Sequence, residues 1–157
     1  MSSTSSLFHK HPAHPPPVRR HNEPVIVLVT VCTNGKEPLL ANDNAHSALV
    51  RAWQQASHWR VGDYVIMPDH LHLFCMPGSA DYPSIRRWVG YWKRLVGNIE
   101  PQMKSIFQQD CWDTQMRDRF HYDEKVSYVH RNPERKGLAT QWEDWPYRGH
   151  VFDVHWL

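Results

Sequence analysis

The chain has 157 residues, of which 41% are hydrophobic and 22% are charged, and its formal net charge at neutral pH is +2. This length fits one domain with a sizeable core, and no apolar run approaches the roughly 20 residues of a membrane span. Three cysteines lie far apart and form no CxxC pair. We therefore expect a cytoplasmic protein with reduced thiols and no membrane association, rather than a disulfide framework or a zinc knuckle.

The N-terminal segment differs in composition from the rest of the chain. Residues 1–23 are rich in serine, histidine and proline and show almost no apolar periodicity, so we expect a disordered or loosely attached tail. Residues 1–24 also carry the whole net charge, because the remaining chain has 15 cations and 15 anions. Only local clusters of charge can then indicate a nucleic-acid partner. We expect one folded domain over residues 24–149 and a C-terminal tail over residues 150–157.

Three strands are predicted in the first half of this domain. The β-branched run Pro24–Thr33 is typical of a buried central strand. The stretches Trp59–Met67 and His70–Met76 flank the turn-forming Met-Pro-Asp sequence and predict a hairpin.

Helical spacing of apolar residues appears twice beside these strands. Residues 42–57 predict a helix with Asp43 or Asn42 as its N-cap, and Pro83 marks the start of a second helix over residues 84–99. The second helix has an apolar stripe with a period of 3.6 residues.

The remaining elements complete the predicted fold. A fourth strand is expected within Ile106–Met116, and a last helix begins at Tyr122 or Asp123 and continues past Tyr128 to end before Pro133. The residues after Gly137 read as an irregular segment. The order β-α-β-β-α-β-α predicts an α+β fold, with a ferredoxin-like split βαβ antiparallel sheet, helices on one face and an added C-terminal helix.

Two histidines separated by one leucine begin the third strand. Because side chains alternate across a strand, His70 and His72 share a face, and the two leucines that follow them share the other. Two imidazoles side by side on a rigid strand form a preformed grip for a divalent cation. Alternatively, each histidine simply hydrogen-bonds near the sheet surface. A complete metal site needs a further donor from elsewhere in the chain.

The segment Glu124–Leu138 offers such a donor together with a nucleophile. Tyr128 and Asn132 are four residues apart and would share one helical face, and the Asn132 amide oxygen is a suitable metal ligand. A phenol attacks poorly at neutral pH, and a nearby cation eases its ionisation. Alternatively, Tyr128 is a packing residue and Asn132 ends the helix before the proline.

Several ordered motifs resemble those of a known family. "MPDHLHLF" is similar to the Met-Pro-Asn/Asp-His-hydrophobic-His-hydrophobic signature of the REP-associated tyrosine transposases, which are single-tyrosine HUH transposases. "YVHRNPERKGL" resembles their Tyr-hydrophobic-x-x-Asn-Pro-x-Arg-x-Gly-Leu signature. "CWDTQMRDRF" and "WEDWPYRG" resemble the segments that precede and follow it. The resemblance covers about residues 25–149.

The resemblance implies a fold, a reaction and a set of site residues. It implies that His70, His72 and Asn132 bind Mg²⁺ or Mn²⁺, and that Tyr128 attacks a DNA phosphodiester to form a 5′-phosphotyrosine and free a 3′-hydroxyl. It implies a ferredoxin-like sheet and a bacterial, nucleoid-associated location. The family's substrates are single-stranded DNA hairpins formed by palindromic extragenic repeats. Mixed nitrogen and oxygen ligands favour Mn²⁺ over Mg²⁺.

Basic side chains gather in three places where they suit DNA phosphates. The second helix carries four cations without an acid between them, two arginines flank the fourth strand, and three cations surround the Asn-Pro motif. Exposed aromatics such as Trp112, Tyr122 or Trp145 would stack on unpaired bases. The candidate DNA-binding residues are Arg86, Arg87, Lys93, Arg94, Arg117, Arg119, Arg131, Arg135 and Lys136.

Two other functions remain open from the residues alone. One is a metal-dependent hydrolase that uses the two histidines and an acidic ligand, Asp69 or Asp110, to activate water. The other is a non-catalytic protein that binds hairpin DNA through its basic helix. The polar segment after Gly137 offers no clear dimer seam, which favours a monomer over a homodimer.

Overall fold

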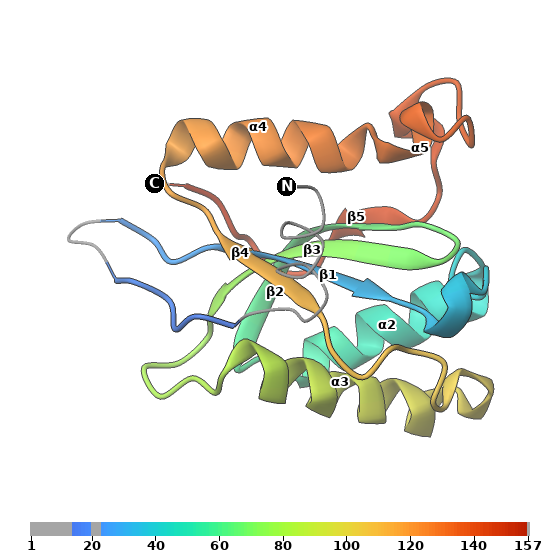
Figure 1. Ribbon diagram of the computed structural model, residues 1–157, viewed down its shortest axis with the longest axis horizontal. Coiled ribbons are helices and arrows are strands. Elements are labelled where there is room, and N and C mark those ends of the chain that lie inside the picture. The colour runs from blue at the N-terminus through green and yellow to red at the C-terminus, as the bar shows by residue number, and fades with distance from the viewer. Residues whose placement is uncertain (1–13, 20–22, 157) are drawn as a thin grey trace, which may run out of the picture.

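The computed structural model describes residues 14–19 and 23–156, and its centre is a five-stranded antiparallel sheet (Figure 1). The strand order is β4-β1-β3-β2-β5, so β3 lies in the middle with a partner on each side. The two outer strands are the shortest of the five. The strands are β1 (Val27–Cys32), β2 (Trp59–Ile66), β3 (His70–Pro77), β4 (Trp112–Gln115) and β5 (Arg148–His150).

Helices cover both faces of this sheet (Figure 1). Two long helices lie on one face and pack against each other, and a third crosses the opposite face. Short 3-10 turns occupy Asn34–Lys36, Pro101–Met103 and Trp142–Asp144. The α-helices are α2 (Asp43–Gln55) and α3 (Ile85–Ile99) on the first face, then α4 (Arg119–His130) on the second, followed by the short α5 (Asn132–Arg135).

The alternation of side chains along β3 divides the core into two clusters. Leu71 and Leu73 are fully buried in the larger cluster, together with the tryptophans of α2 and α3. Phe74 points to the other face, where its ring meets that of Tyr122 from α4 at a centroid distance of 5.5 Å. The sheet is therefore buried on both faces, and the even-numbered residues of β3 face α4.

The predicted α+β fold and its antiparallel sheet are confirmed, and the element order from β1 to α4 matches the expected β-α-β-β-α-β-α. Of the two N-cap candidates for α2, Asn42 is the cap, since its side chain accepts a hydrogen bond from the Ala45 amide. The start predicted for the last helix was wrong. This helix begins at Arg119, because Asp118 caps it by accepting from the His121 amide at 2.7 Å.

The C-terminal part is more ordered than its sequence suggested. β5, which the sequence analysis read as irregular, pairs with β2 through Tyr64 and Gly149. Beyond it, Val154 is buried against the α4 side of the core and its carbonyl accepts a hydrogen bond from the Tyr122 hydroxyl at 3.2 Å. The Val154 side chain rests directly on Gly62 of β2, where an added Cβ would lie 2.6 Å from the Val154 Cβ.

Part of the predicted N-terminal tail contacts the edge of the sheet. Residues 1–13 and 20–22 lie outside the described residues, but residues 14–19 run beside β4. The His14 ring sits between two carboxylates, 2.6 Å from Asp110 and 3.1 Å from Asp113. Val18 exchanges two backbone hydrogen bonds with the Gln115 side chain, each 2.7 Å long. This short stretch is thus attached to the folded part of the chain.

Helix length and the state of the cysteines bear on the expected lack of membrane association and of disulfides. No helix in residues 14–19 and 23–156 is long and apolar enough to cross a bilayer. All three cysteines are free thiols, with Cys75 and Cys111 buried and Cys32 partly buried.

Candidate metal and nucleophile site

The two histidines of the sequence motif lie side by side in the middle of the sheet. On β3, His72 pairs with Thr30 of β1 on one side and Val65 of β2 on the other. The ring centroids of His70 and His72 are 4.9 Å apart, and the rings meet edge to face at 78°. Because they share the face with Phe74, both rings point to the side covered by α4 and α5.

Each imidazole is held by a neighbour at its Nδ1 atom. His70 Nδ1 lies 2.7 Å from the Asp69 carboxylate, and His72 Nδ1 lies 2.8 Å from the Thr30 hydroxyl. A carboxylate can only accept, so the proton of a neutral His70 resides on Nδ1 and its Nε2 carries a lone pair. Such a carboxylate–histidine contact is typical of histidines that bind metals through Nε2.

The electrostatics of the pair favour the neutral form of the inner ring. Burial, followed by the charges of His70 and Arg135, lowers the pKa of His72 to about 3. Burial alone would raise the pKa of Asp69, but the hydrogen bond and charge of His70 outweigh it and lower that pKa. His72 therefore presents an unprotonated nitrogen, and Asp69 remains an anion that accepts from His70.

The third predicted ligand reaches the histidines from α5. The Asn132 amide nitrogen lies 3.3 Å from His70 Nε2, and the residue is only 6% exposed. Turning this amide by 180° would place its oxygen beside the same lone pair. The chain does not continue from α4 to Asn132 as one regular helix, because Arg131 has φ −82° and ψ 0° and separates α4 from α5. The single shared helical face predicted for Tyr128 and Asn132 is thus interrupted.

The predicted nucleophile stands at the surface of α4 beneath a cation. Tyr128 is 57% exposed, and the Arg135 guanidinium carbon lies 3.6 Å from the centroid of its ring. Lys125 lies 5.6 Å from the same centroid. Arg135 also acts on His72 through its charge. The same guanidinium therefore stacks on Tyr128 and acts on His72 through its charge. The short segment 128–132 also joins Tyr128 to Asn132.

The residues present fit a divalent cation. Two imidazole Nε2 atoms and one amide belong to side chains that already have their outer contacts, which is the arrangement that orients metal ligands. Nitrogen and oxygen donors of this kind suit Mn²⁺ and related ions. Asp69 is engaged with His70 Nδ1, so it occupies an outer position rather than that of an acidic ligand.

Comparison with known proteins points to one family. No family model matches the chain. It is 29% identical over 98 residues to the REP-associated tyrosine transposase of Escherichia coli strain K12, which covers 61% of this chain and 57% of that protein. It is 27% identical over 103 residues to a Haemophilus influenzae protein provisionally given the same name, covering 57% of each. By sequence, the chain is similar to the REP-associated tyrosine transposases.

This sequence similarity confirms the resemblance that the motifs indicated. The chain spans a little over half (57%) of the length of the two curated transposases it matches. A solved structure of a REP-associated tyrosine transposase bound to a REP hairpin has the same fold, with a TM-score of 0.68 over 89% of this chain and 94% of that one, at 20% identity.

The structure separates the predicted DNA-binding residues into two groups. Five of them lie in or next to α4 and α5 in the sequence, and α4 covers the face of the sheet that carries the histidine pair. Two of these five also form exposed ion pairs: Arg119 with Asp123 at 3.8 Å and Arg131 with Glu134 at 3.3 Å. The five residues are Arg117, Arg119, Arg131, Arg135 and Lys136.

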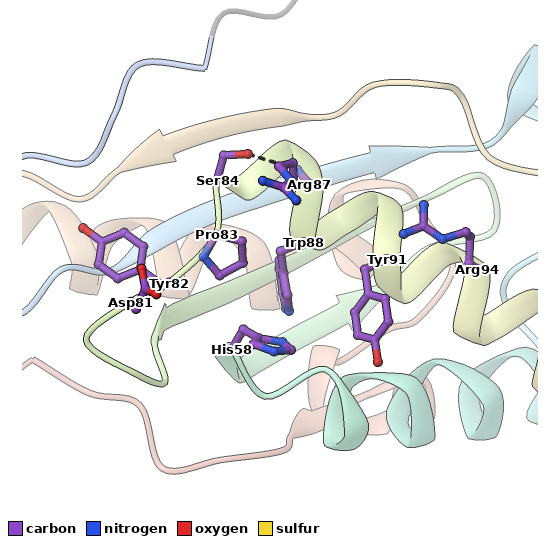
Figure 2. Close-up of a pocket in the computed structure, with 9 residues that line it drawn as sticks. All are labelled: His58, Asp81, Tyr82, Pro83, Ser84, Arg87, Trp88, Tyr91 and Arg94. Atoms are coloured by element: carbon purple, nitrogen blue, oxygen red, sulfur yellow. Dashed lines mark hydrogen bonds between the residues drawn. The ribbon is translucent and has the colours of Figure 1, made fainter.

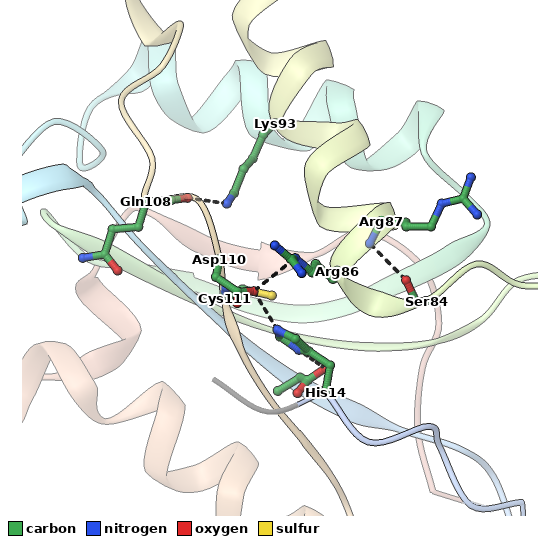
Figure 3. Close-up of polar contacts among 9 residues, drawn as sticks. His14, Ser84, Arg86, Arg87, Lys93, Gln108, Asp110 and Cys111 are labelled. Carbon is green, nitrogen blue, oxygen red and sulfur yellow. Dashed lines mark hydrogen bonds and ion pairs between the residues drawn. The ribbon is translucent and has the colours of Figure 1, made fainter. Parts of the chain in front are cut away.

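The other group lies on α3, across the sheet from the histidine pair. Two of its four cations are engaged with the segment before β4 (Figure 3). Lys93 donates to the Gln108 carbonyl at 2.6 Å, and burial lowers its pKa. Arg86 lies 4.0 Å from the Asp110 carboxylate, which also binds His14. Arg87 and Arg94 face elsewhere. The basic rim predicted for α3 is therefore not one uniform surface.

Some aromatic residues expected to stack on bases were assigned wrongly. Tyr122 and Trp145 are buried, and the Trp145 indole donates to the Ile66 carbonyl at 2.9 Å. Trp112 is exposed, as expected. The supporting residues Thr30 and Asp69 were not predicted as contacts of the histidines. Asp69 directly precedes His70, so the Asp-His dipeptide was an available signal, whereas Thr30 is brought to His72 by strand pairing.

Proposed function

We propose that this protein is a DNA strand transferase that cuts and rejoins single-stranded or hairpin DNA through Tyr128. The observation that carries the proposal is the convergence of His70, His72 and Asn132, together with Arg135, which stacks on Tyr128 and whose charge also acts on His72. Homology to transposases named for REP sequences supports hairpin DNA formed by such repeats as the substrate. DNA transposition or mobilisation of repeats would be the outcome.

The covalent step follows from the exposed phenol. Tyr128 Oη loses its proton and attacks the phosphorus of the scissile phosphodiester, and the bond from phosphorus to the 3′ oxygen breaks. The 3′ oxygen leaves as a hydroxyl after taking up a proton, and the 5′ phosphate remains on the tyrosine. Attack by a 3′-hydroxyl reverses these changes and joins the strands. No nucleoside triphosphate is needed, because the phosphotyrosine bond conserves the energy of the broken bond.

The remaining site residues hold and orient the reactants. His70 Nε2, His72 Nε2 and the Asn132 amide oxygen would bind Mg²⁺ or Mn²⁺, which when bound supplies charge stabilisation at a phosphate oxygen. Asp69 keeps the proton of a neutral His70 on Nδ1, and Thr30 holds the His72 ring at its Nδ1 atom. Arg135 positions the Tyr128 ring and adds positive charge where a phosphate would lie. The strand order β4-β1-β3-β2 supports a ferredoxin-like core with α4 as an added catalytic helix.

Detection of a covalent adduct tests this proposal. Hairpin DNA labelled on the 3′ side of the cleavage point is incubated with the protein and Mn²⁺ and run on a denaturing gel. The labelled DNA should migrate with the protein. Tyr128→Phe removes the nucleophile but leaves the ring on which Arg135 stacks, so this variant should form no adduct while still binding DNA and Mn²⁺.

The same gel separates the rival functions. Cleavage that persists in Tyr128→Phe would support a hydrolase and overturn the proposal. Absence of both cleavage and adduct in the unaltered chain, with hairpin binding intact, would support a non-catalytic DNA-binding protein. We further propose that the unit that acts is a monomer; size-exclusion chromatography with light scattering, with and without hairpin DNA, tests this.

A further inference from the structure

A hollow of about 610 Å³ opens beside α3, away from the histidine pair (Figure 2). Its lining includes His58 before β2, Asp81 from the loop after β3, Ser84 at the N-cap of α3, and Arg87, Tyr91 and Arg94 of α3. α3 covers the face of the sheet opposite to α4 (Figure 1). The hollow also lies near the end of β3, whereas His70 stands at its beginning. It is therefore separate from the candidate metal and nucleophile site.

Two cations of α3 are directed to this hollow. Arg87 and Arg94 are seven residues apart, which is two helical turns, so they share a side of α3. Within residues 14–19 and 23–156, neither guanidinium has a carboxylate at ion-pair distance, although Asp81 contributes to the same lining. Their neighbour Arg86 lies near Asp110 instead, and Figure 3 shows its side chain apart from that of Arg87.

One aromatic ring lies between the two arginines. Tyr91 is 36% exposed, and its ring meets the edge of His58 at a centroid distance of 6.0 Å. Figure 2 shows the Tyr91 ring extending from α3 beside His58, with Arg94 on its other side. The Ser84 hydroxyl is already engaged, since it caps α3 by accepting a hydrogen bond from the Arg87 amide. The groups directed to a ligand are thus the two guanidinium ions and one half-exposed phenol ring.

This combination matches the chemistry of single-stranded nucleic acid. Alternating positive charges and an exposed aromatic ring bind phosphates and stack an unpaired base without reading its sequence. Seven helical residues rise about 10.5 Å, so the two arginines leave α3 two turns apart with the Tyr91 position between them in the sequence. The pair of arginines can therefore contact different phosphates of one DNA strand.

We propose that the hollow formed by Arg87, Tyr91, Arg94 and His58 is a second DNA-binding site, which holds an unpaired part of the substrate away from the scissile phosphate. The proposal extends the proposed strand-transfer function, because it assigns a second place to the same DNA. The eight residues of β3 span about 26 Å. Only DNA that reaches over at least this distance can occupy both sites at once.

The test measures binding in a chain that cannot cut. In the Tyr128→Phe background, fluorescence anisotropy compares a hairpin with a long single-stranded flank and a short oligonucleotide that contains only the cleavage point. The double variant Arg87→Ala/Arg94→Ala should bind the long DNA at least tenfold more weakly. Its log–log salt dependence should be shallower by about two. The short oligonucleotide should bind as before.

Matched variants separate the site from general charge and from folding. Arg51→Ala/Lys104→Ala removes the same charge from other exposed positions and should change long-DNA binding much less. Tyr91→Ala should weaken binding about fivefold to over a hundredfold, whereas Tyr91→Phe keeps the stacking ring and the affinity. Equal losses for the two double variants, or an unchanged salt slope after loss of Arg87 and Arg94, would overturn the proposal.

The result is independent of the covalent chemistry. If the unaltered chain forms no adduct, the proposed transferase function fails, but the difference between long and short DNA still decides the second site. If the adduct forms and the α3 variants bind all DNA normally, the transferase stands and the second site fails. A hollow that instead selects an acidic peptide over DNA in the same anisotropy assay would also contradict the proposal.

Discussion

Asn132 approaches His70 to 3.3 Å across 62 residues of sequence, and this contact brings the last short helix onto the middle strand of the sheet. The contact depends on the break at Arg131, which turns the chain at the end of α4. It also depends on Asp69, which keeps the His70 proton on the opposite side of the ring. The proposed metal site is thus built from a strand, a turn and a helix end.

Replacing Asp69 should weaken metal binding without removing a ligand. Asp69→Asn loses the anionic acceptor that fixes the His70 tautomer, and outer contacts of this kind contribute about 10- to 100-fold in metal affinity. Isothermal titration with Mn²⁺ should show this loss. A second metal-compatible group must be controlled, since ligand atoms of His14, Asp110 and Cys111 lie within 4.8 Å of one another. Titrations in a His14→Ala background isolate the His70 site, and an unchanged affinity there would contradict the assigned role.

Arg135 should affect the rate of adduct formation more than the stability of the fold. Its guanidinium stacks on an exposed Tyr128 ring, and a cation–π contact of this type contributes about 0.5–2 kcal/mol. Arg135→Ala should therefore slow adduct formation roughly two- to thirtyfold at saturating DNA. Arg135→Lys keeps the charge but loses the planar stack, so its rate of adduct formation should fall between those of the unaltered chain and Arg135→Ala. Arg119→Ala, at the start of α4 rather than in α5, serves as the control for lost charge.

The attachment of the N-terminal segment should depend on pH. Burial lowers the pKa of His14, but its hydrogen bonds to Asp113 and Asp110 outweigh this and raise it overall. A histidine with a raised folded pKa stabilises fully below its unfolded pKa of about 6.5, and the contribution is lost as pH rises through the folded pKa.

Thermal unfolding of the unaltered chain and His14→Gln tests this dependence. Hydrogen bonds to charged groups contribute roughly 1 to 3 kcal/mol, so the variant should be less stable by that amount at pH 6. The difference should shrink at pH 8. Arg86, which lies near Asp110, keeps its charge over this range and does not mask the effect. A difference that grows with pH would show that His14 is not the titrating group.

Gly62 should tolerate no larger side chain while the C-terminal segment is in place. An added Cβ would lie 2.6 Å from the Val154 Cβ, well inside contact distance, so Gly62→Ala must displace the segment that packs on β2. Overpacking of this kind costs about 1–3 kcal/mol, to be measured by denaturant unfolding. The double variant Gly62→Ala/Val154→Ala should be more stable than the sum of the single changes predicts. Strict additivity would mean that the two residues do not meet.

The sequence allowed most of the sheet and the histidine pair to be predicted, because local patterns determine both. Two strand-like runs on either side of the Met-Pro-Asp turn identified β2 and β3, and the alternation of side chains along a strand placed His70 and His72 on one face. β5 was missed because three residues that include Gly149 form no pattern of their own and become a strand only by pairing with β2. The early start of α4 was missed because the Asp118 cap was not used as a signal.

Long-range relationships account for the other differences. The four cations of α3 look equivalent in sequence, yet Lys93 is occupied by the Gln108 carbonyl and Arg87 is not. Tyr122 and Trp145 were predicted to be exposed aromatics. In the fold, Tyr122 donates to the Val154 carbonyl of the C-terminal segment, and Trp145 donates to the Ile66 carbonyl of β2. Such differences depend on which distant segments pack together, and spacing along the chain does not determine them.

The shortness of β4 and β5 also governs how the molecule meets its own copies. An exposed strand edge invites a further strand from another chain, and long flat edges lead to aggregation. Here the outermost strands have four and three residues, and residues 14–19 lie along β4. Concentrated preparations should therefore resist fibril formation. Removing residues 1–19 should expose the edge of β4 and so promote self-assembly from strand edge to strand edge.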